Sequence, residues 1–168
     1  KLFLYLCNSK RNFVLRDICK NSYDFDRKEK LVYIGAYCLM PNHSHILVRE
    51  KEDGGISKFM QKLSTAYVMY FNMRYERTGG LFEGKFKSQH ADSNRYLKYL
   101  FSYIHLNPMK LVDKEWKEKG IQNLAAARAH LLDYSHSSYL DYAGTSRLQS
   151  KILSRNHFPS YFPNPTKF

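Results

Sequence analysis

The chain has few of the residues on which several large protein classes depend. Only 3 of its 168 residues are cysteine, 5 are proline and 1 is tryptophan. The three cysteines (Cys7, Cys19 and Cys38) are odd in number and lack metal-type spacing, which predicts free thiols in a reducing compartment. No apolar run approaches the ~18 residues that a membrane helix needs. No basic-then-apolar leader opens the sequence either, so we expect a cytoplasmic protein without a membrane partner.

Acidic residues are scarce as well. The chain has 15 Asp and Glu against 27 Lys and Arg, which gives a formal net charge of +12. This balance is typical of proteins that bind nucleic-acid phosphates, although a generically basic protein would share it. An aromatic content of 15% supplies rings on which bases can stack, while most such rings belong to a core. The length predicts one domain over residues 1–150, followed by a C-terminal extension over 151–168.

Turn chemistry and hydrophobic spacing locate the main elements. Residues 31–40 and 43–49 are rich in β-branched, aromatic and aliphatic residues and flank a Pro-Asn turn, which predicts a β-hairpin. Residues 2–7 are compatible with a helix or a strand. We expect Pro108 to disfavour helical geometry at Asn107 and to end a helix there. The further predicted elements are helices over 56–74, 92–107 and 121–132, a short helix in 111–118, a strand over 81–91 and an extended tail over 158–168.

Two segments combine residues that are suited to chemistry. His43 and His45 stand at i and i+2, so on a strand their imidazoles would share a face. Tyr103 and Asn107 stand at i and i+4, so on a helix they would project together, whereas His105 would lie roughly 160° from Tyr103. A His-x-His pair alone more often belongs to a surface or a core, and 14 tyrosines make any single one weak evidence. Together, the two pairs outline a metal-assisted phosphoryl-transfer site.

Several segments, in this order, carry a resemblance to a known family: residues 37–48, 67–75, 80–88, 103–108 and 134–139. The first resembles the HUH motif of single-tyrosine transposases, and the set is most similar to the REP-associated tyrosine transposase branch. The resemblance extends from about residue 31 to residue 142. Residues 8–30 match none of the motifs, and the first strand of the family would lie upstream of Lys1 or be missing.

The resemblance implies an α+β fold with a ferredoxin-like antiparallel sheet, helices packed on one face and an HUH-type nuclease core. It implies that Tyr103 attacks a phosphodiester of single-stranded or hairpin DNA, leaving a 5′-phosphotyrosine and a free 3′-hydroxyl. His43, His45 and Asn107 would hold Mg²⁺ or Mn²⁺; Gln is commoner than Asn as the third ligand in the wider superfamily, and Asn fits the REP-associated branch. The protein would act as a monomer or a homodimer. The sequence indicates no general base for Tyr103.

Six basic residues are candidates for contacts with the DNA backbone, although a solvated surface role is open for each of them: Lys58, Lys62, Arg74, Arg77, Lys85 and Lys87.

Two other functions are compatible with the same residues. A domesticated protein could bind hairpin DNA without cutting it, although such a protein would have no need of His43, His45, Tyr103 and Asn107 together. A conventional metal phosphoesterase would activate water instead, and Tyr103 would then be dispensable. A covalent protein–DNA adduct separates these functions from a transposase.

Overall fold

The computed structural model describes residues 1–14 and 23–161. Contacts between residues divide the chain into two units. The first unit comprises Lys1–Tyr33 and Arg49–His90, and the second comprises Ile34–Val48 and Ala91–Phe168. Helices and a two-stranded sheet make up the described part, which confirms the α+β class. The predicted thiol of Cys19 lies outside the described residues, and Cys7 and Cys38 are buried and free.

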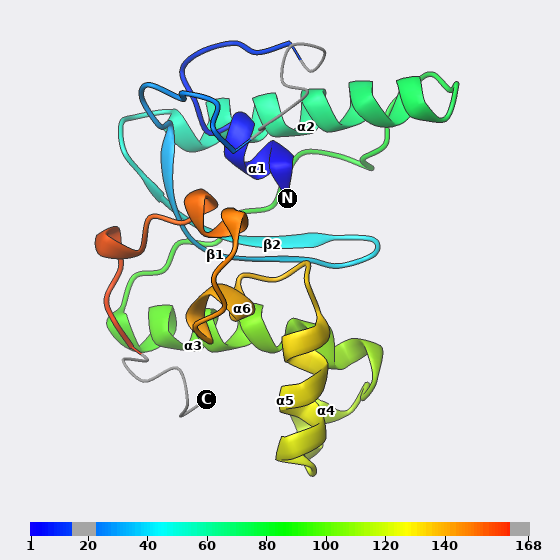
Figure 1. Cartoon of the computed structure of the whole chain (residues 1–168), viewed down its shortest axis with the longest axis vertical. Helices are drawn as coiled ribbons and strands as arrows, with labels where there is room; N and C mark the ends of the chain where they lie inside the picture. Colours follow the sequence, from blue (N-terminus) through cyan, green and yellow to red (C-terminus); the bar gives the residue numbers. More distant parts are fainter. Residues whose placement is uncertain (15–22, 162–168) are drawn as a thin grey trace. The chain divides into compact units, whose positions relative to one another are not determined.

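The first unit is built around a long helix. α1 (Leu2–Leu6) settles the helix-or-strand alternative at the start of the chain in favour of a helix. α2 (Gly55–Arg74) confirms the helix predicted from hydrophobic spacing. The ring of Phe3 on α1 lies 5.5 Å from that of Tyr70 on α2, centroid to centroid. Aromatic contacts of this kind join the two helices, which lie side by side in Figure 1.

The strand predicted over residues 81–91 is wrong. These residues form bends and irregular structure in the described part of the chain, and all but Leu81 and Ala91 are exposed. The alternation of Phe82 and Phe86 would suit one face of a strand, but the two rings are 54% and 43% exposed. A lone strand gains little without a partner ladder and a buried face, and Gly84 adds conformational freedom between the two rings.

The second unit contains most of the predicted hairpin. β1 (Val32–Leu39) and β2 (Ser44–Glu50) form the two-stranded sheet, and the Met40 N–H donates to the His43 carbonyl at 2.8 Å across the turn. One face of the hairpin packs on α3 (Asn94–Leu106), as Figure 1 shows. The buried residues of this contact are Ala36, Cys38, Met40, Leu47, Phe101 and Ile104. The hairpin and α3 therefore share one hydrophobic core.

Both ends of α3 follow from the sequence. Ser93 is the N-cap, and its hydroxyl accepts from the Tyr96 N–H at 3.3 Å. α3 ends at Leu106, one residue before the predicted end, and the chain continues as a 3₁₀ helix, η2 (Asn107–Leu111). The expected backbone of Asn107 is wrong, however, because it is helical with φ −54° and ψ −36°. Pro108 occupies the first turn of the new helix, where its missing N–H leaves no bond unmade.

Short elements complete the second unit: α4 (Trp116–Lys119), α5 (Leu124–Asp133), α6 (Tyr139–Tyr142), η3 (Leu148–Ile152) and η4 (Arg155–His157). α4 and α5 confirm the helices predicted within 111–118 and 121–132, with shifted bounds. A second hydrophobic cluster, which includes Met109, Trp116 and Leu131, joins this region to the residues that follow α3. Residues 158–161 belong to no helix or strand, and the rest of the predicted tail lies outside the described residues.

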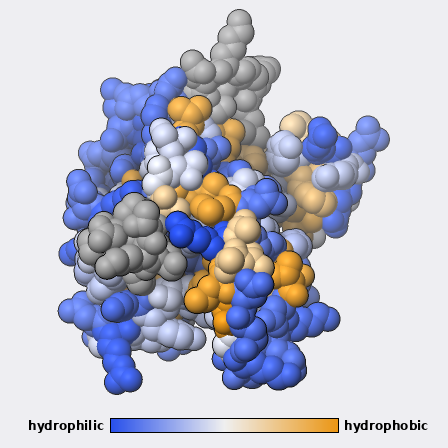
Figure 2. Space-filling view, turned by 60° about the horizontal axis from the view of Figure 1, so that its bottom comes forward, coloured by the Kyte–Doolittle hydropathy of each residue, from blue (hydrophilic) through white to orange (hydrophobic). Residues whose placement is uncertain are grey.

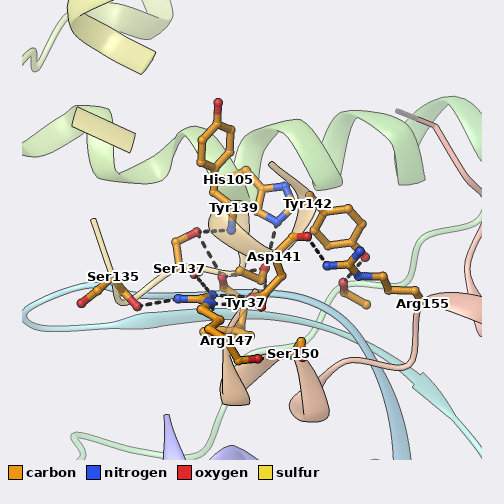
Figure 3. Close-up of polar contacts among 12 residues, drawn as sticks. Tyr37, His105, Ser135, Ser137, Tyr139, Asp141, Tyr142, Arg147, Ser150 and Arg155 are labelled. Atoms are coloured by element: carbon orange, nitrogen blue, oxygen red, sulfur yellow. Dashed lines mark hydrogen bonds and ion pairs between the residues drawn. The ribbon is translucent and has the colours of Figure 1, made fainter. Parts of the chain in front are cut away.

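A buried polar network holds the end of the second unit against β1 (Figure 3). Arg147 pairs with the buried carboxylate of Asp141 and donates to the Tyr37 hydroxyl at 3.3 Å. Ser137 forms an antiparallel bridge with Cys38, and the Ser138 N–H donates to the Tyr37 carbonyl at 2.9 Å. Charges this deeply buried are tolerated because each is paired and hydrogen-bonded. The network therefore fixes the residues around Ser137 along β1.

The surface agrees with the composition. The face drawn in Figure 2 is largely hydrophilic and carries scattered hydrophobic patches. No helix in the described part of the chain is both long and apolar enough to cross a bilayer.

Candidate active site

The hairpin presents the two predicted histidines side by side. His43 closes the turn just before β2, and His45 lies on β2. Their ring centroids are 5.0 Å apart, as the i, i+2 spacing predicts. His43 is exposed, whereas His45 is half-buried.

Asn42 orients the exposed histidine. Its Oδ1 lies 2.7 Å from His43 Nδ1, which favours the tautomer with the proton on Nδ1. The lone pair of His43 is then on Nε2. A side chain that holds one ring nitrogen in this way is common behind metal-binding histidines. Sequence reasoning treated Asn42 as a turn residue only, because nothing in the sequence shows where its side chain points.

His45 is held in its neutral form. Burial lowers its pKa below the ordinary value, and electrostatic interactions with His43, Lys110 and Lys117 lower it further. Its Nε2 is buried and has no hydrogen-bond partner. A neutral imidazole with a free ring nitrogen is the form that binds a metal ion.

α3 brings Tyr103 to the histidines. The ring centroid of Tyr103 lies 5.3 Å from that of His45, with the planes at 75°. Tyr103 belongs to the rim of the core between hairpin and helix, where it is partly buried. The helical phase predicted from the sequence therefore places Tyr103 on the side of α3 that faces His45.

A hydrogen bond links the Asn107 side chain to the backbone of Tyr103. Its Nδ2 donates to the Tyr103 carbonyl at 3.1 Å, across one turn of helix. This bond sets the orientation of the amide, because a flipped group would place two oxygens against each other. The side chain is fully buried, and its Oδ1 has no hydrogen-bond partner. An unpaired buried acceptor costs free energy unless a ligand satisfies it.

The donor set fits a divalent cation. His45 Nε2 and Asn107 Oδ1 are both buried without a partner in the protein, and the His43 ring adjoins that of His45. Imidazole nitrogen and amide oxygen are suitable ligands for Mn²⁺ and, less strongly, for Mg²⁺. No cluster of three His, Cys, Asp or Glu side chains occurs in the described residues, so a metal site here needs the amide. The ligand roles of these residues stay predictions.

Two lysines that sequence reasoning missed adjoin the tyrosine. Lys117 Nζ lies 4.3 Å from the centroid of the Tyr103 ring. Burial raises the pKa of Tyr103, but hydrogen bonds with Asn107 and Lys117 and the charges of Lys117 and Lys110 outweigh it and lower the pKa overall. The charge of residues 111–118 is visible in the sequence, but their position relative to Tyr103 depends on how η2 and α4 turn.

His105 lies on the other side of α3, as its helical phase predicts. It is 2% exposed, and its Nε2 lies 2.8 Å from the Ser138 hydroxyl. Burial lowers its pKa to about 3, and the charge of Arg155 acts in the same direction. It is a core residue.

The six candidate DNA contacts belong to the first unit. Lys58, Lys62 and Arg74 lie on α2, and the other three follow it. Lys62 is only partly exposed and donates to the carbonyls of Ser9 and Arg11 at 2.6 and 2.7 Å. Its charge is therefore used inside the unit, while the other five side chains are exposed. Their contacts with DNA stay predictions.

A cavity of about 400 Å³ lies elsewhere in the second unit, with Phe101, Arg155 and Tyr161 among its lining residues. None of the four predicted site residues lines it. The candidate site lies instead where the hairpin packs on α3.

Comparison with known proteins identifies the family of the chain. The model of a family described as "Transposase IS200 like" matches residues 5–107, which include His43, His45, Tyr103 and Asn107. Searches of curated proteins and of solved structures found no match. The matched segment covers more than half of the chain and contains the whole candidate site, so this protein belongs to the family of IS200-like transposases.

Proposed function

We propose that this transposase cleaves and rejoins single-stranded or hairpin DNA through a covalent bond to Tyr103. The observation that carries the proposal is the contact of Tyr103 with His45, where α3 packs on the hairpin. The hydroxyl-bearing ring of Tyr103 adjoins His45, while the buried Nε2 of His45 and Oδ1 of Asn107 have no partner in the protein. A nucleophile beside two unused ligand atoms is the arrangement expected of phosphodiester cleavage with a metal ion.

The chemical step exchanges one ester for another. The Tyr103 oxygen loses its proton to solvent and bonds to phosphorus, and the bond from phosphorus to the 3′ oxygen breaks. The released 3′ oxygen takes up a proton, so the products are a 5′-phosphotyrosine and a free 3′-hydroxyl. Because the phosphoester bond is preserved, a 3′-hydroxyl can reverse the step and join a new strand without a nucleotide cofactor.

The residues around Tyr103 favour this attack. The positive charges of Lys117 and Lys110 and the bond with Asn107 stabilise the ionised phenol, which is the better nucleophile. The same lysines stabilise the negative charge that builds on the phosphate. His43, His45 and Asn107 would hold the divalent ion, Mg²⁺ or Mn²⁺, which when bound supplies Lewis-acid polarisation of the phosphate oxygens.

The finer assignments belong to the same proposal. The hairpin would be part of a ferredoxin-like sheet; its packing on α3 and the pairing of Ser137 with Cys38 support this. The Asn at position 107 supports the REP-associated branch. The net charge of +12 supports binding to a DNA strand, by a monomer or a homodimer.

The test is adduct formation on labelled single-stranded hairpin DNA with Mg²⁺ or Mn²⁺. The wild-type protein should form a covalent adduct that survives denaturing electrophoresis, and Tyr103→Phe should form none while keeping its fold and its affinity for DNA. Tyr99→Phe is the matched control on the same helix and should keep most of the activity.

Three outcomes would contradict the proposal. DNA binding without any cleavage or adduct in the wild-type protein would favour a domesticated binding protein. Cleavage that persists in Tyr103→Phe would favour water as the nucleophile. An adduct that disappears in Tyr99→Phe but not in Tyr103→Phe would move the nucleophile one turn back along α3.

A further inference from the structure

Three tyrosines form a continuous stack along one flank of α3. The rings of Tyr96 and Tyr99 are 6.1 Å apart and inclined by 16°, and those of Tyr99 and Tyr103 are 5.9 Å apart and inclined by 19°. Their spacing of three and four residues places them on neighbouring turns. The tyrosine stack, as we call these three residues, therefore ends at the proposed nucleophile.

Two rings of the stack, those of Tyr96 and Tyr99, do not belong to the hydrophobic core. Leu97, Leu100 and Tyr103 pack against the cluster between α3 and the hairpin, but Tyr96 and Tyr99 are not among its members. Tyr99 is 55% exposed. A large ring held in this position gives up much of the free energy that burial would supply. Part of the Tyr99 ring is therefore available to a ligand.

Positive charges lie at both ends of the stack. Arg95 is exposed and stands one turn before Tyr99 on the same side of the helix. At the other end, Lys117 Nζ lies 4.3 Å from the Tyr103 ring centroid, and the charges of both Lys117 and Lys110 act on Tyr103. Aromatic faces with cations beside them are the surface that binds single-stranded nucleic acid, because bases stack on the rings while phosphates contact the cations.

We propose that Tyr99 and Tyr96 form a stacking platform for the nucleobases next to the phosphodiester that Tyr103 attacks. The platform is continuous with the nucleophile, so a base on Tyr99 is attached to a phosphate near Tyr103. Stacking requires unpaired bases, which makes the platform selective for single strands over a paired duplex. The two residues are positioning residues, since neither touches the reacting atoms. The inference rests on the proposed function for the role of Tyr103.

Charge favours a nucleic-acid strand over a second copy of this chain as the occupant. A copy with the same cations, Arg95, Lys110 and Lys117, would bring like charges together on a surface of like sign. A polyanion with flat bases matches both the cations and the rings.

The test separates stacking from phosphate binding. Affinity is measured by fluorescence anisotropy for two labelled 20-nucleotide strands, one of thymidines and one of abasic sites with the same phosphates. All variants carry Tyr103→Phe, which keeps the ring and prevents cleavage. Tyr99→Ala should weaken binding of the thymidine strand by about 5- to 100-fold. Tyr99→Phe, which keeps an aromatic face, should bind as the parent does, and neither change should affect the abasic strand.

Each other result overturns the inference. Equal affinities of Tyr99→Ala and its parent for the thymidine strand would show that no base stacks there. Equal losses for both strands would assign the ring to the fold or to phosphate binding, and circular dichroism would identify a folding defect. A loss that accompanies dissociation of a dimer in sedimentation would make a second copy the occupant.

The result is distinguishable from that of the proposed cleavage. If the wild-type protein forms no adduct but Tyr99→Ala still loses affinity for the thymidine strand alone, cleavage fails and the platform stands as part of a binding protein. If the adduct forms and Tyr99→Ala binds both strands normally, cleavage stands and the platform fails.

Discussion

The two flanks of α3 each have a histidine beside them, and the two histidines are in opposite situations. His105, on the helix itself, is 2% exposed, lies against the rings of Phe101 and Tyr142, and contacts the Ser138 hydroxyl. His45, on β2, is only half-buried, and the ring of Tyr103 adjoins it. Each has one buried ring nitrogen without a partner, Nδ1 of His105 and Nε2 of His45.

The comparison shows that an imidazole becomes a candidate ligand through its neighbours, not through an unused nitrogen alone. His105 is enclosed by aromatic rings, so no substrate reaches it. Beside His45 stand a second imidazole and the ring of Tyr103, whose carbonyl accepts from the Asn107 amide. The following predictions test this difference, beginning with the largest expected effect.

Loss of either histidine of the hairpin should abolish cleavage. We expect His43→Ala and His45→Ala each to lower adduct formation by at least about 100-fold, since changing even a supporting residue of a metal site costs 10- to 100-fold. Affinity for DNA should be largely kept, because phosphates are bound by other residues. The measurement is adduct yield with Mg²⁺ and Mn²⁺ in excess. Wild-type yield in either variant would remove both histidines from the site.

Changes to the amides beside the histidines should be milder. Asn107→Ala leaves a position that water can fill, and Asn42→Ala removes only the partner of His43 Nδ1. We expect each to lower the apparent affinity for Mn²⁺ by about 10- to 100-fold. Titration of adduct yield against Mn²⁺ measures this, and activity should recover at high Mn²⁺ concentration. A loss that no Mn²⁺ concentration restores would show that the amide acts in another way.

The buried His105 should control stability at low pH. The pKa of His105 is about 3 in the folded chain and near 6.5 in the unfolded chain, so the unfolded state binds more protons between these values. The free energy of unfolding should therefore fall as the pH drops below about 6.5, by roughly 2 kcal/mol at pH 5.

Denaturant unfolding at pH 7 and pH 5 measures this contribution, with His105→Gln as the control. The variant has no titratable group at this position, so its loss between the two pH values should be about 2 kcal/mol smaller than that of the wild type. Equal losses would place a protonated His105 in the folded core, against its burial.

The smallest expected effect concerns the contribution of Lys117, beside Tyr103, to the salt dependence of DNA binding. Log affinity for single-stranded DNA should fall with log salt by about 0.7 for each phosphate neutralised. If Lys117 contacts one phosphate, Lys117→Met should lower the slope by about that amount, while Lys119→Met, on the same short helix but paired with Glu115, should change it less. An unchanged slope in Lys117→Met would leave this lysine a role toward Tyr103 alone.

Local patterns were sufficient to predict the elements that carry the site. The hairpin and α3 have clear turn and cap residues, such as Ser93, and the period of α3 correctly separates Tyr103 from His105. Sequence reasoning failed where a long-range partner decides the outcome. The spacing of Phe82 and Phe86 suits a strand, but a strand also needs a neighbour that the sequence does not specify.

Side-chain direction outside regular structure was also beyond the sequence. The position of Lys117 depends on the turn from α3 into η2 and then α4. Asn42 is a turn residue by type, and its contact with His43 depends on one rotamer. The pairing of Ser137 with Cys38 joins segments about a hundred residues apart, which no local pattern encodes.

The hydrogen bond from the Asn107 amide to the Tyr103 carbonyl links the proposed nucleophile rigidly to one proposed ligand. Any tilt or slide of α3 moves both together, and the two histidines travel separately with the hairpin. The alignment of the two halves of the site therefore depends on the apolar cluster that includes Leu47 of β2 and Phe101 of α3. Weaker packing between the hairpin and α3 would misalign the reacting groups although each of them stayed intact. The hydrophobic core therefore sets the alignment of the site as well as its stability.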